Sequence, residues 1–524
     1  MLRKRLWPTL SDEFTKCARA FYLDLMSSIF LFVCASFMAG RVWRFPFDDE
    51  ADALFKIECC HSPIELLTFY LKGGDIHPPV SQLLFYELQH LGMSEAAMRL
   101  CSIAMTALAL AFFHLIALAL VARRSGEVVS LTSRLIAVLL FGLSPLAIGQ
   151  GDAIRWYPLF AMLVSLFVTL YLFSRNETAR LWSSIPLGLA ASTNFLAIIV
   201  FAPFALYRYG LQRQFRASFD FTFWLVVLLF AGCGIISAYS IFGPRFNVVM
   251  QSQLDSSVVQ AVMSDVLGFF GGYALGISQA WIIVPAVVFC AVAAFSEIDR
   301  TQPANPVHLF LLMLVAAAMM VLPGFSKPRS FLYLAPVVAV LLTLFLDRQV
   351  RRGQTGRVVL LSALILAPSF GVIANIKFGA HPFKRDLVIP YQSIVDFIQI
   401  NERGSVLVIS TDPVIPWELR QQHDSTDDRC ATYFLSEGPF TVGAVARCLG
   451  SGRRYDSIFV ITGHSDKSAD AAFMQMFHSA VETLIAGRQK MATMHAGVDE
   501  DADMKSFLTG VPLDKYILTV DFYK

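Results

Sequence analysis

The chain has 524 residues, of which 56% are hydrophobic and only 16% are charged, and its formal net charge is +2. Soluble domains contain roughly 45 to 50% apolar residues, so this composition, with a mean hydropathy of +0.58, is typical of an integral membrane protein. The nearly balanced charge excludes a global basic field that would attract nucleic acid.

A series of apolar runs is about as long as the 17 to 25 residues that cross a bilayer. The runs lie near residues 21–41, 97–122, 131–150, 156–174, 221–242, 277–296, 307–323, 330–346 and 357–375. Lys and Arg favour cytoplasmic loops, and basic residues precede the first run and lie in the short loops after the second and fourth runs. This pattern predicts a multi-pass protein with a cytoplasmic N-terminus.

Residues 181–207 resemble a single long helix, but basic residues lie on both sides of it, at Arg180 and Arg208. Because both sides favour the cytoplasm, the chain must cross the membrane twice. We therefore expect a turn at the polar residues 191–194, near the outer surface, between two short helices. The total becomes about eleven transmembrane helices, and an odd count places the chain after residue 376 outside.

The C-terminal part has a different composition, because charges return and β-rich runs appear at residues 405–410 (SVLVIS) and 458–462 (IFVIT). Helix-like stretches such as residues 469–486 separate these runs. The pattern predicts an extracytoplasmic soluble α/β domain over residues 377–524, after a transmembrane module over residues 1–376.

The first outer loop, residues 42–96, contains signals for structured helices. Ser62 and Glu65 have the spacing of a capping box, with Pro63 at the first helical position. After Pro78 and Pro79, apolar residues recur at helical spacing, which predicts an amphipathic helix on the membrane surface. These apolar residues are Val80, Leu83, Leu84, Leu88 and Leu91. We therefore expect this loop to be folded.

Ionisable residues gather in the segments that this threading places at the outer surface. The stretch RFPFDDEADALF, residues 44–55, contains Asp48, Asp49, Glu50 and Asp52, and later segments contain Asp75, His77, Asp152 and Arg155. The first group could simply cap a helix, since acidic side chains stabilise a helix N-terminus by about 0.3 to 1 kcal/mol. The convergence of carboxylates, a histidine and a guanidinium also fits a site just above the hydrocarbon.

The order of the motifs resembles the membrane-embedded GT-C glycosyltransferases. The matching residues are Asp49-Glu50 after the first helix, His77-Pro78-Pro79, Ser94-Glu95 before Met98-Arg99-Leu100, and Arg155-Trp156-Tyr157. The most similar group is the dolichyl-phosphate-mannose protein mannosyltransferase family, with the related bacterial aminoarabinose transferases. The resemblance covers residues 20–210 and continues more weakly at Lys327-Pro328-Arg329 and Tyr333. It implies a GT-C-like fold in the bacterial inner membrane.

The resemblance also implies an activity, the transfer of a sugar from a polyprenyl-phosphate donor to an extracytoplasmic lipid, polysaccharide or protein, with inversion. Asp49 is the expected general base, with Glu50 as its supporting partner. The leaving phosphate gains negative charge, which guanidinium groups stabilise. Arg155 and Arg329 are the expected donors to it, followed by Lys327 and His77. Arg155 and Arg329 could instead anchor helix ends, and His77 could be a turn residue.

No cofactor is required by this chemistry. Asp75 and Asp152 could hold a divalent cation together with Asp49, because carboxylates suit Mg²⁺ or Ca²⁺. Nothing in the spacing demands a metal ion, and the arginines could supply its charge. Cys430 and Cys448 both lie in the predicted outer domain, where an oxidising compartment would permit a disulfide.

Two other functions are compatible with a chain of this kind. A transporter of a lipid or glycan would have charged residues near the bilayer midplane or interrupted helices. Here Asp and Glu are nearly absent from the interiors of the apolar runs, and the break at Ser192-Thr193-Asn194 is the feature that a transporter could use. A noncatalytic scaffold for the C-terminal domain would leave the ordered motifs unexplained.

Overall fold

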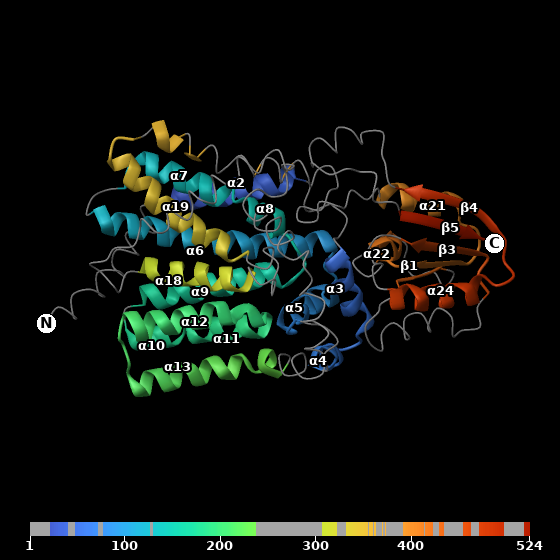
Figure 1. Cartoon of the computed structure of the whole chain (residues 1–524), viewed down its shortest axis with the longest axis horizontal. Coiled ribbons are helices and arrows are strands. Elements are labelled where there is room, and N and C mark those ends of the chain that lie inside the picture. The colour runs from blue at the N-terminus through green and yellow to red at the C-terminus, as the bar shows by residue number, and fades with distance from the viewer. Residues whose placement is uncertain are drawn as a thin grey trace. The chain divides into compact units, whose positions relative to one another are not determined.

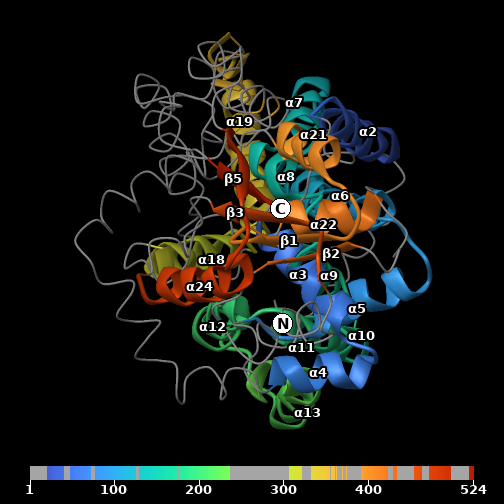
Figure 2. The same cartoon turned by 90° about the vertical axis from the view of Figure 1, so that its right-hand side faces the viewer.

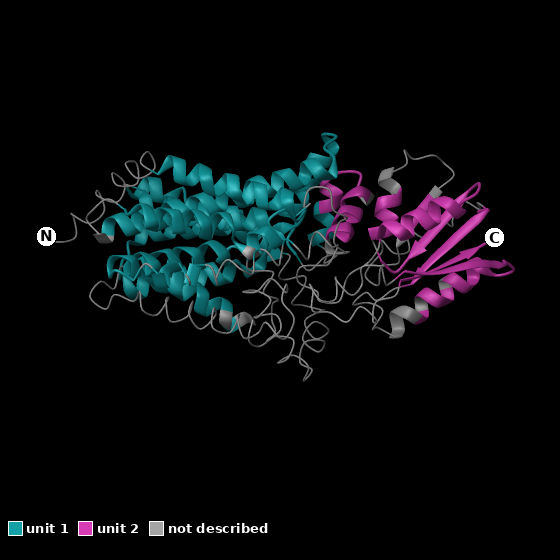
Figure 3. Cartoon of the chain, turned by 90° about the horizontal axis from the view of Figure 1, so that it is seen from above, with its two compact units in different colours: residues 1–42, 67–374 teal, residues 43–66, 375–524 magenta. Residues whose placement is uncertain are grey.

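The computed structural model describes residues 21–39, 48–71, 77–125, 129–174, 176–236, 306–321, 332–354, 356–359, 361–362, 369, 373, 391–412, 414–422, 429–433, 454–462, 471–496 and 518–524. The chain divides into two compact units, coloured separately in Figure 3. Unit 1 consists of residues 1–42 and 67–374, and unit 2 of residues 43–66 and 375–524. The predicted transmembrane module includes the whole loop 42–96, whereas residues 43–66 of that loop group with the C-terminal residues.

Unit 1 is built of helices (Figure 1). In chain order they are α2 (Tyr22–Met38), α5 (Val80–His90), α6 (Glu95–Ser125), α7 (Leu131–Gly142), α8 (Pro145–Gln150), α9 (Trp156–Phe173), α10 (Glu177–Leu181), α11 (Ser184–Thr193), η2 (Phe195–Ala197), α12 (Ile198–Ala205), η3 (Leu206–Leu211), α13 (Ala217–Phe230), α18 (Pro306–Val321) and α19 (Leu334–Arg351). Helix α4 (Pro63–Leu71) crosses the boundary between the units.

The predicted apolar runs coincide with helices wherever the structure describes them. Three described stretches are long and apolar enough to cross a membrane, namely Glu95–Arg123, Leu131–Gln150 and Trp156–Phe173. Helix α6 packs against α2, α9 and α19, while α11 packs against α9 and α13. The chain is an integral membrane protein. The run at residues 277–296 and most of the run at 357–375 lie outside the described residues.

The run at residues 131–150 forms two helices instead of the single predicted one. Helix α7 ends at Gly142, and α8 begins at Pro145 after an extended Ser144 with φ −64° and ψ 117°. The residue before a proline is disfavoured in the helical region. Pro145 therefore breaks the run, and as the first residue of α8 it needs no backbone N–H donor.

The helix break predicted at residues 191–194 is confirmed. Helix α11 ends at Thr193, and Asn194 is extended, with φ −158° and ψ 139°. Its side-chain oxygen accepts a 2.8 Å hydrogen bond from the Leu196 backbone N–H. The chain then returns, because Arg216, after the second helical segment, forms an ion pair with Glu177, before the first one.

The helix after Pro78 and Pro79 is also present, as α5, but it buries a different face from the one that the apolar spacing emphasised. The buried residues are Ser81, Gln82, Phe85 and Tyr86. Val80, Leu83, Leu84 and Leu88 are half-buried and Leu91 is exposed. The polar and aromatic face therefore packs on protein, which leaves the aliphatic face available for lipid.

Unit 2 contains a five-stranded sheet of order β2-β1-β3-β5-β4. The strands are β1 (Val406–Ser410), β2 (Arg429–Tyr433), β3 (Ser457–Thr462), β4 (Lys490–Ala496) and β5 (Leu518–Tyr523). The helices among the described residues of this unit are α3 (Asp48–Cys59), α21 (Tyr391–Asn401), α22 (Val414–Gln422) and α24 (Ala471–Ile485). Strand β1 pairs in parallel with β2 and β3, whereas β5 is antiparallel to β3 and β4. The runs 405–410 and 458–462 coincide with β1 and β3.

The sheet of unit 2 has an apolar core on each face, because neighbouring side chains of a strand point to opposite faces. Val406 and Val408 of β1 face α21 and α22. Leu407 and Ile409 face α24. Figure 2 shows α24 and α21 on opposite sides of the strands. Unit 2 therefore has three layers, with its sheet in the middle.

Candidate functional site

The residues between α8 and α9 form a buried turn that contains two of the predicted site residues. The hydroxyl of Thr106, on α6, donates a 2.8 Å hydrogen bond to the carbonyl oxygen of Gly151. A Cβ on Gly151 would lie only 2.4 Å from the carbonyl oxygen of Ala147 and 2.8 Å from Thr106 Cγ2. The turn is therefore held tightly against α6, and only glycine fits at its first position.

Asp152 and Arg155 lie in this turn and are 1% and 6% exposed. Arg155 is the N-cap residue of α9, with an extended backbone at φ −143° and ψ −179°. The positive end of the α9 helix dipole adds to the positive charge of Arg155. This end of α9 therefore suits an anion.

Aromatic contacts bring His77 and the start of α19 to this end of α9. The His77 ring lies 5.7 Å from the Trp156 ring, between ring centroids. Trp156 contacts Phe160 at 5.7 Å, and Phe160 contacts Tyr333 edge to face at 5.1 Å. The segments that the motif series predicted as neighbours are thus joined through α9. The predicted donors Lys327 and Arg329 precede Tyr333 in the sequence and lie outside the described residues.

The Ser94-Glu95 motif forms the beginning of α6. The Ser94 hydroxyl accepts a hydrogen bond from the Ala97 backbone N–H, and Arg99 forms an ion pair with Glu95 one turn earlier. The side chain of Arg99 is buried. These residues stabilise the N-terminal turn of α6 next to α5, so this motif has a clear structural role.

The acidic stretch after the first apolar run forms helix α3 of unit 2, which begins at Asp48. The side chains of Asp48 and Asp49 lie outside the described part of the chain. Glu50 is 1% exposed. Asp52 forms a 2.7 Å ion pair with Lys56, one turn later in the helix. Carboxylates in the first turn favour helix formation, so capping and a chemical role are compatible in this helix.

The remaining predicted site residues fall largely outside the described part. Asp75 and Cys448 are among the residues that the structure does not describe. Cys430 is half-buried at β2 and is disulfide-bonded. Among the described residues, no three His, Cys, Asp or Glu side chains group closely enough to hold a metal ion. The proposed cation site would also need Asp75 and Asp49, so it stays a prediction.

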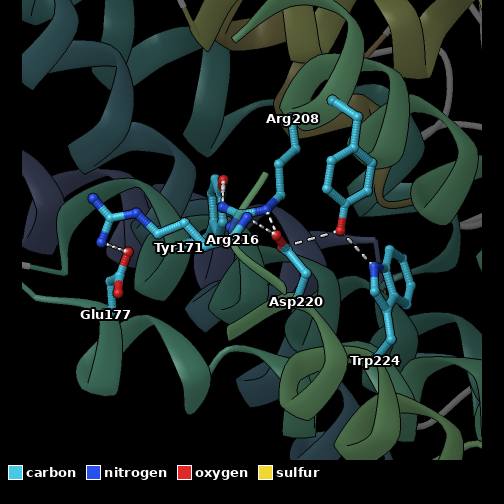
Figure 4. A network of polar contacts seen from close by, with 7 residues as sticks. Tyr171, Glu177, Arg208, Arg216, Asp220 and Trp224 are labelled. Carbon is cyan, nitrogen blue, oxygen red and sulfur yellow. Dashed lines mark hydrogen bonds and ion pairs between the residues drawn. The ribbon is translucent and has the colours of Figure 1, made fainter. Parts of the chain in front are cut away.

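A second polar cluster, at the other end of α9, was not predicted as a unit (Figure 4). Arg208 Nη1 donates a 2.9 Å hydrogen bond to the hydroxyl of Tyr171, near the C-terminal end of α9. In the sequence, the basic residues of this region indicate only the membrane topology. Their buried contacts depend on which helices pair, and local spacing does not encode that. Thr106, inside an apolar run, was missed for the same reason.

Comparisons with known proteins identify the fold of the chain. No protein-family model matches the chain, and no curated protein gives a significant match. The crystal structure of ArnT from Cupriavidus metallidurans bound to undecaprenyl phosphate aligns over 96% of this chain and 98% of that one, with a TM-score of 0.51 and 12% identity.

Two further similar structures have lower TM-scores. Apo ArnT from the same organism has a TM-score of 0.47 at 12% identity, over 85% of this chain and 87% of that one. Mycobacterial arabinofuranosyltransferase AftD has a TM-score of 0.38 at 16% identity, over 97% of this chain and 41% of that one. ArnT is an aminoarabinose transferase with a GT-C fold. The alignment with undecaprenyl-phosphate-bound ArnT, at a TM-score of 0.51, shows that the chain has the GT-C fold, as the order of its motifs predicted.

Proposed function

We propose that this protein is a membrane glycosyltransferase that moves a sugar from a polyprenyl-phosphate donor to the hydroxyl of a lipid, polysaccharide or protein. The observation that carries the proposal is the buried turn with Asp152 and Arg155 at the N-terminus of α9, in a chain with the fold of a structure that holds undecaprenyl phosphate. A helix N-terminus and a guanidinium group both favour a phosphate.

In the proposed reaction, the acceptor oxygen attacks the anomeric carbon while Asp49 takes the hydroxyl proton. The bond from the anomeric carbon to the phosphate oxygen breaks, and the lipid phosphate leaves with the electron pair. A single displacement of this kind inverts the anomeric configuration. Glu50 supports the base. A divalent cation at Asp75 and Asp152 would be an additional source of positive charge.

The phosphate would be stabilised by Arg155, with Arg329, Lys327 and His77 as further contacts. Charge-assisted hydrogen bonds from guanidinium groups are about twice as strong as neutral ones. Such contacts operate in the ground state and strengthen as the oxygen gains charge, so they support both donor binding and leaving-group departure.

The proposal includes an orientation with about eleven spans, a cytoplasmic N-terminus, and residues 377–524 outside the bacterial inner membrane. Basic residues support it. Arg134 of α7 pairs with Asp24 of α2 at 2.7 Å, and Arg351 pairs with Asp347 of α19 at 2.8 Å. Ser133 also donates to Asp347 at 2.7 Å, so these basic residues share the end of the helices that the positive-inside rule places in the cytoplasm.

The test is sugar transfer by the purified protein in liposomes that contain polyprenyl-phosphate sugars. Asp49→Asn keeps the size and the helix-capping ability of the residue and removes its basicity. We expect turnover to fall about 100- to 10,000-fold, as is typical for loss of a general base, with normal membrane insertion. Near-wild-type transfer by Asp49→Asn would remove this residue from the mechanism and redirect the search to Glu50.

Two controls separate the parts of the proposal. Arg155→Ala should raise the KM for the donor as well as lower kcat, because its contact operates in both states. Labelling of Ser465→Cys from the outside of intact cells tests the orientation. Labelling from the cytoplasmic side alone would contradict the threading and the outer location of the site.

A further inference from the structure

Helix α22 of unit 2 has two apolar faces, although one side of a helix usually suffices for packing on a sheet. Ile415 and Leu419, one turn apart, lie in the core that α21, α22 and the sheet share. Trp417 follows Ile415 by two residues, which is about 200° around a helix. It is absent from that core and is nevertheless only 1% exposed. Trp417 therefore lies on a different side of α22 from Ile415 and Leu419.

Phe55 of α3 is a side chain that meets Trp417. Their ring centroids are 5.7 Å apart, and the rings are inclined by 69°, an edge-to-face arrangement that aromatic pairs prefer. Phe55 is 5% exposed. Helix α3 packs on α22 within unit 2. A helix from near the start of the chain is thus attached to the C-terminal α/β layers by a buried aromatic pair.

The same helix carries the carboxylates of the proposed mechanism. Glu50, Leu54 and Ile57 are spaced by four and three residues, so they share a face, and all three are almost completely buried. Asp49 lies in the first turn of this helix. A rotation or displacement of α3 would therefore move every carboxylate on it as one body.

We infer that Trp417 is a positioning residue, which acts through Phe55 to hold α3 and hence the carboxylates of that helix in place for catalysis. The inference rests on the proposed function, because it takes Asp49 and Glu50 as the reacting carboxylates. It gives residues 375–524 a catalytic purpose, although the reacting carboxylates lie on α3. A displacement of about 1 Å in a catalytic group can lower a rate by about 100-fold.

The first arm of the test does not depend on activity. Hydrogen exchange of the backbone amides of residues 50–59 is measured in the full-length protein in lipid nanodiscs. Trp417→Ala should speed their exchange about 10- to 100-fold, because removing a buried Trp favours local opening. Trp417→Phe retains an aromatic ring and should stay close to wild type. Wild-type protection of α3 in Trp417→Ala would overturn the inference.

The matched control is Phe477→Ala. Phe477 belongs to α24 and is fully buried between this helix and the other face of the sheet. Its removal should weaken unit 2 without touching α22 or α3, so the exchange of residues 50–59 should change much less than in Trp417→Ala. An equal loss of protection at α3 in both variants would mean that Trp417 matters only for general stability, and would overturn the inference.

The second arm measures kinetics in the same proteins. Trp417→Ala should lower kcat about 100-fold and leave the KM for the donor within about threefold of wild type, whereas Trp417→Phe should restore most of kcat. If α3 loosens and kcat stays at the wild-type value, the positioning role is wrong and the glycosyltransferase proposal stands. If the wild-type protein transfers no sugar, the proposed function is wrong, and the exchange data alone decide whether Trp417 holds α3.

Discussion

Arg208 Nε donates a 2.7 Å hydrogen bond to Asp220 Oδ1, and both side chains are almost completely buried among the helices of unit 1. The Tyr209 hydroxyl also donates to Asp220, at 3.1 Å, and the Trp224 indole N–H donates to the Tyr209 oxygen at 2.7 Å. The Arg216 backbone N–H donates a 2.6 Å hydrogen bond to the other carboxylate oxygen, Asp220 Oδ2. The pair therefore joins η3 to α13 through a satisfied network.

We predict that Asp220→Ala destabilises the protein by about 3 to 5 kcal/mol, the usual result of leaving one charge of a buried pair uncompensated. Unfolding of the purified protein in a mild detergent measures the effect. The double variant Arg208→Leu with Asp220→Leu should recover much of the loss, because well-packed apolar replacements of a buried pair are often neutral. A double variant as unstable as the single one would contradict this account.

The matched control lies in the same cluster. Glu177 and Arg216 also form an ion pair, but their side chains are 43% and 68% exposed. Exposed pairs contribute about 0 to 1 kcal/mol, so Glu177→Gln should leave the unfolding midpoint nearly unchanged. A loss as large as that of Asp220→Ala would show that burial does not decide the strength of these pairs.

A second prediction concerns the turn before α9. Gly151→Ala places a methyl group 3.0 Å from Phe32 Cζ, as well as against the Ala147 carbonyl and Thr106. We expect a loss of about 1 to 3 kcal/mol from overpacking, together with reduced sugar transfer because the turn carries Asp152 and Arg155. Unfolding and transfer assays on the same preparation measure both effects.

Gly232→Ala is the control for this substitution. A Cβ at Gly232 would meet no atom within 4 Å, so the protein should keep its activity and gain up to about 1 kcal/mol from the better helix propensity of alanine. If both glycine variants behave alike, close approach at Gly151 is not what requires glycine there.

Much of unit 1 could be predicted from the sequence, because membrane helices depend on long apolar runs and on the sign of nearby charges. Asn194 could be predicted as a break because the basic residues on both sides demanded an even number of crossings. The sequence predicts Pro145 inside a span, because the apolar run at residues 131–150 is long enough to cross the membrane and the helix-breaking effect of a single proline is local. The pairing of Phe55 with Trp417 could not be predicted, because no local pattern indicates which partner covers an apolar side chain far along the sequence.

The candidate site likewise has some features that the sequence predicts and others that it does not. Asp152, Arg155 and His77 were expected together from the order of their motifs, and the structure joins Trp156, next to Arg155, with His77. The grouping of Asp49 and Glu50 with the C-terminal unit was missed. Their charge pattern indicated a surface and a helix start, and carboxylates carry no signal for the apolar face behind them.

A third prediction is a pH dependence in unit 2. The backbone N–H and hydroxyl of Ser405 donate to Asp456 Oδ2 at 2.9 and 3.1 Å, and these hydrogen bonds lower the pKa of Asp456. Their contribution to stability is therefore complete above the unfolded-state pKa of about 3.9 and is lost as the pH falls through the lower folded-state pKa.

Gly404, at φ +62°, brings the turn so close that a Cβ there would lie 2.2 Å from Asp456 Oδ2. Asp456→Asn should flatten the loss of stability of unit 2 that sets in as the pH falls below the ordinary aspartate pKa of about 3.9. Hydrogen exchange of β1 and β3 in the full-length protein provides the measurement. An unchanged acid limb would show that this turn is not the acid-sensitive element.

The fourth prediction is that Cys448 is the disulfide partner of Cys430. Peptide mapping without reduction should recover the two cysteines in one linked fragment. The closed loop is short, and a bond of this kind contributes about 2 to 4 kcal/mol, so Cys448→Ser should lower the unfolding midpoint of unit 2. Recovery of Cys430 linked to another cysteine, or alkylation of both thiols in untreated denatured protein, would rule out the pairing.

The pairing of α3 with α22 also affects biosynthesis, because the two helices leave the ribosome far apart in time. Helix α3 ends at Cys59 and α22 begins at Val414, so at about 5 to 20 residues per second roughly 20 to 70 s separate them. During that interval Phe55 has no Trp417 to cover it. The nascent chain therefore has to shield this apolar side chain with lipid or a chaperone while the later spans are inserted, and premature termination before residue 414 should yield a product that aggregates or is degraded.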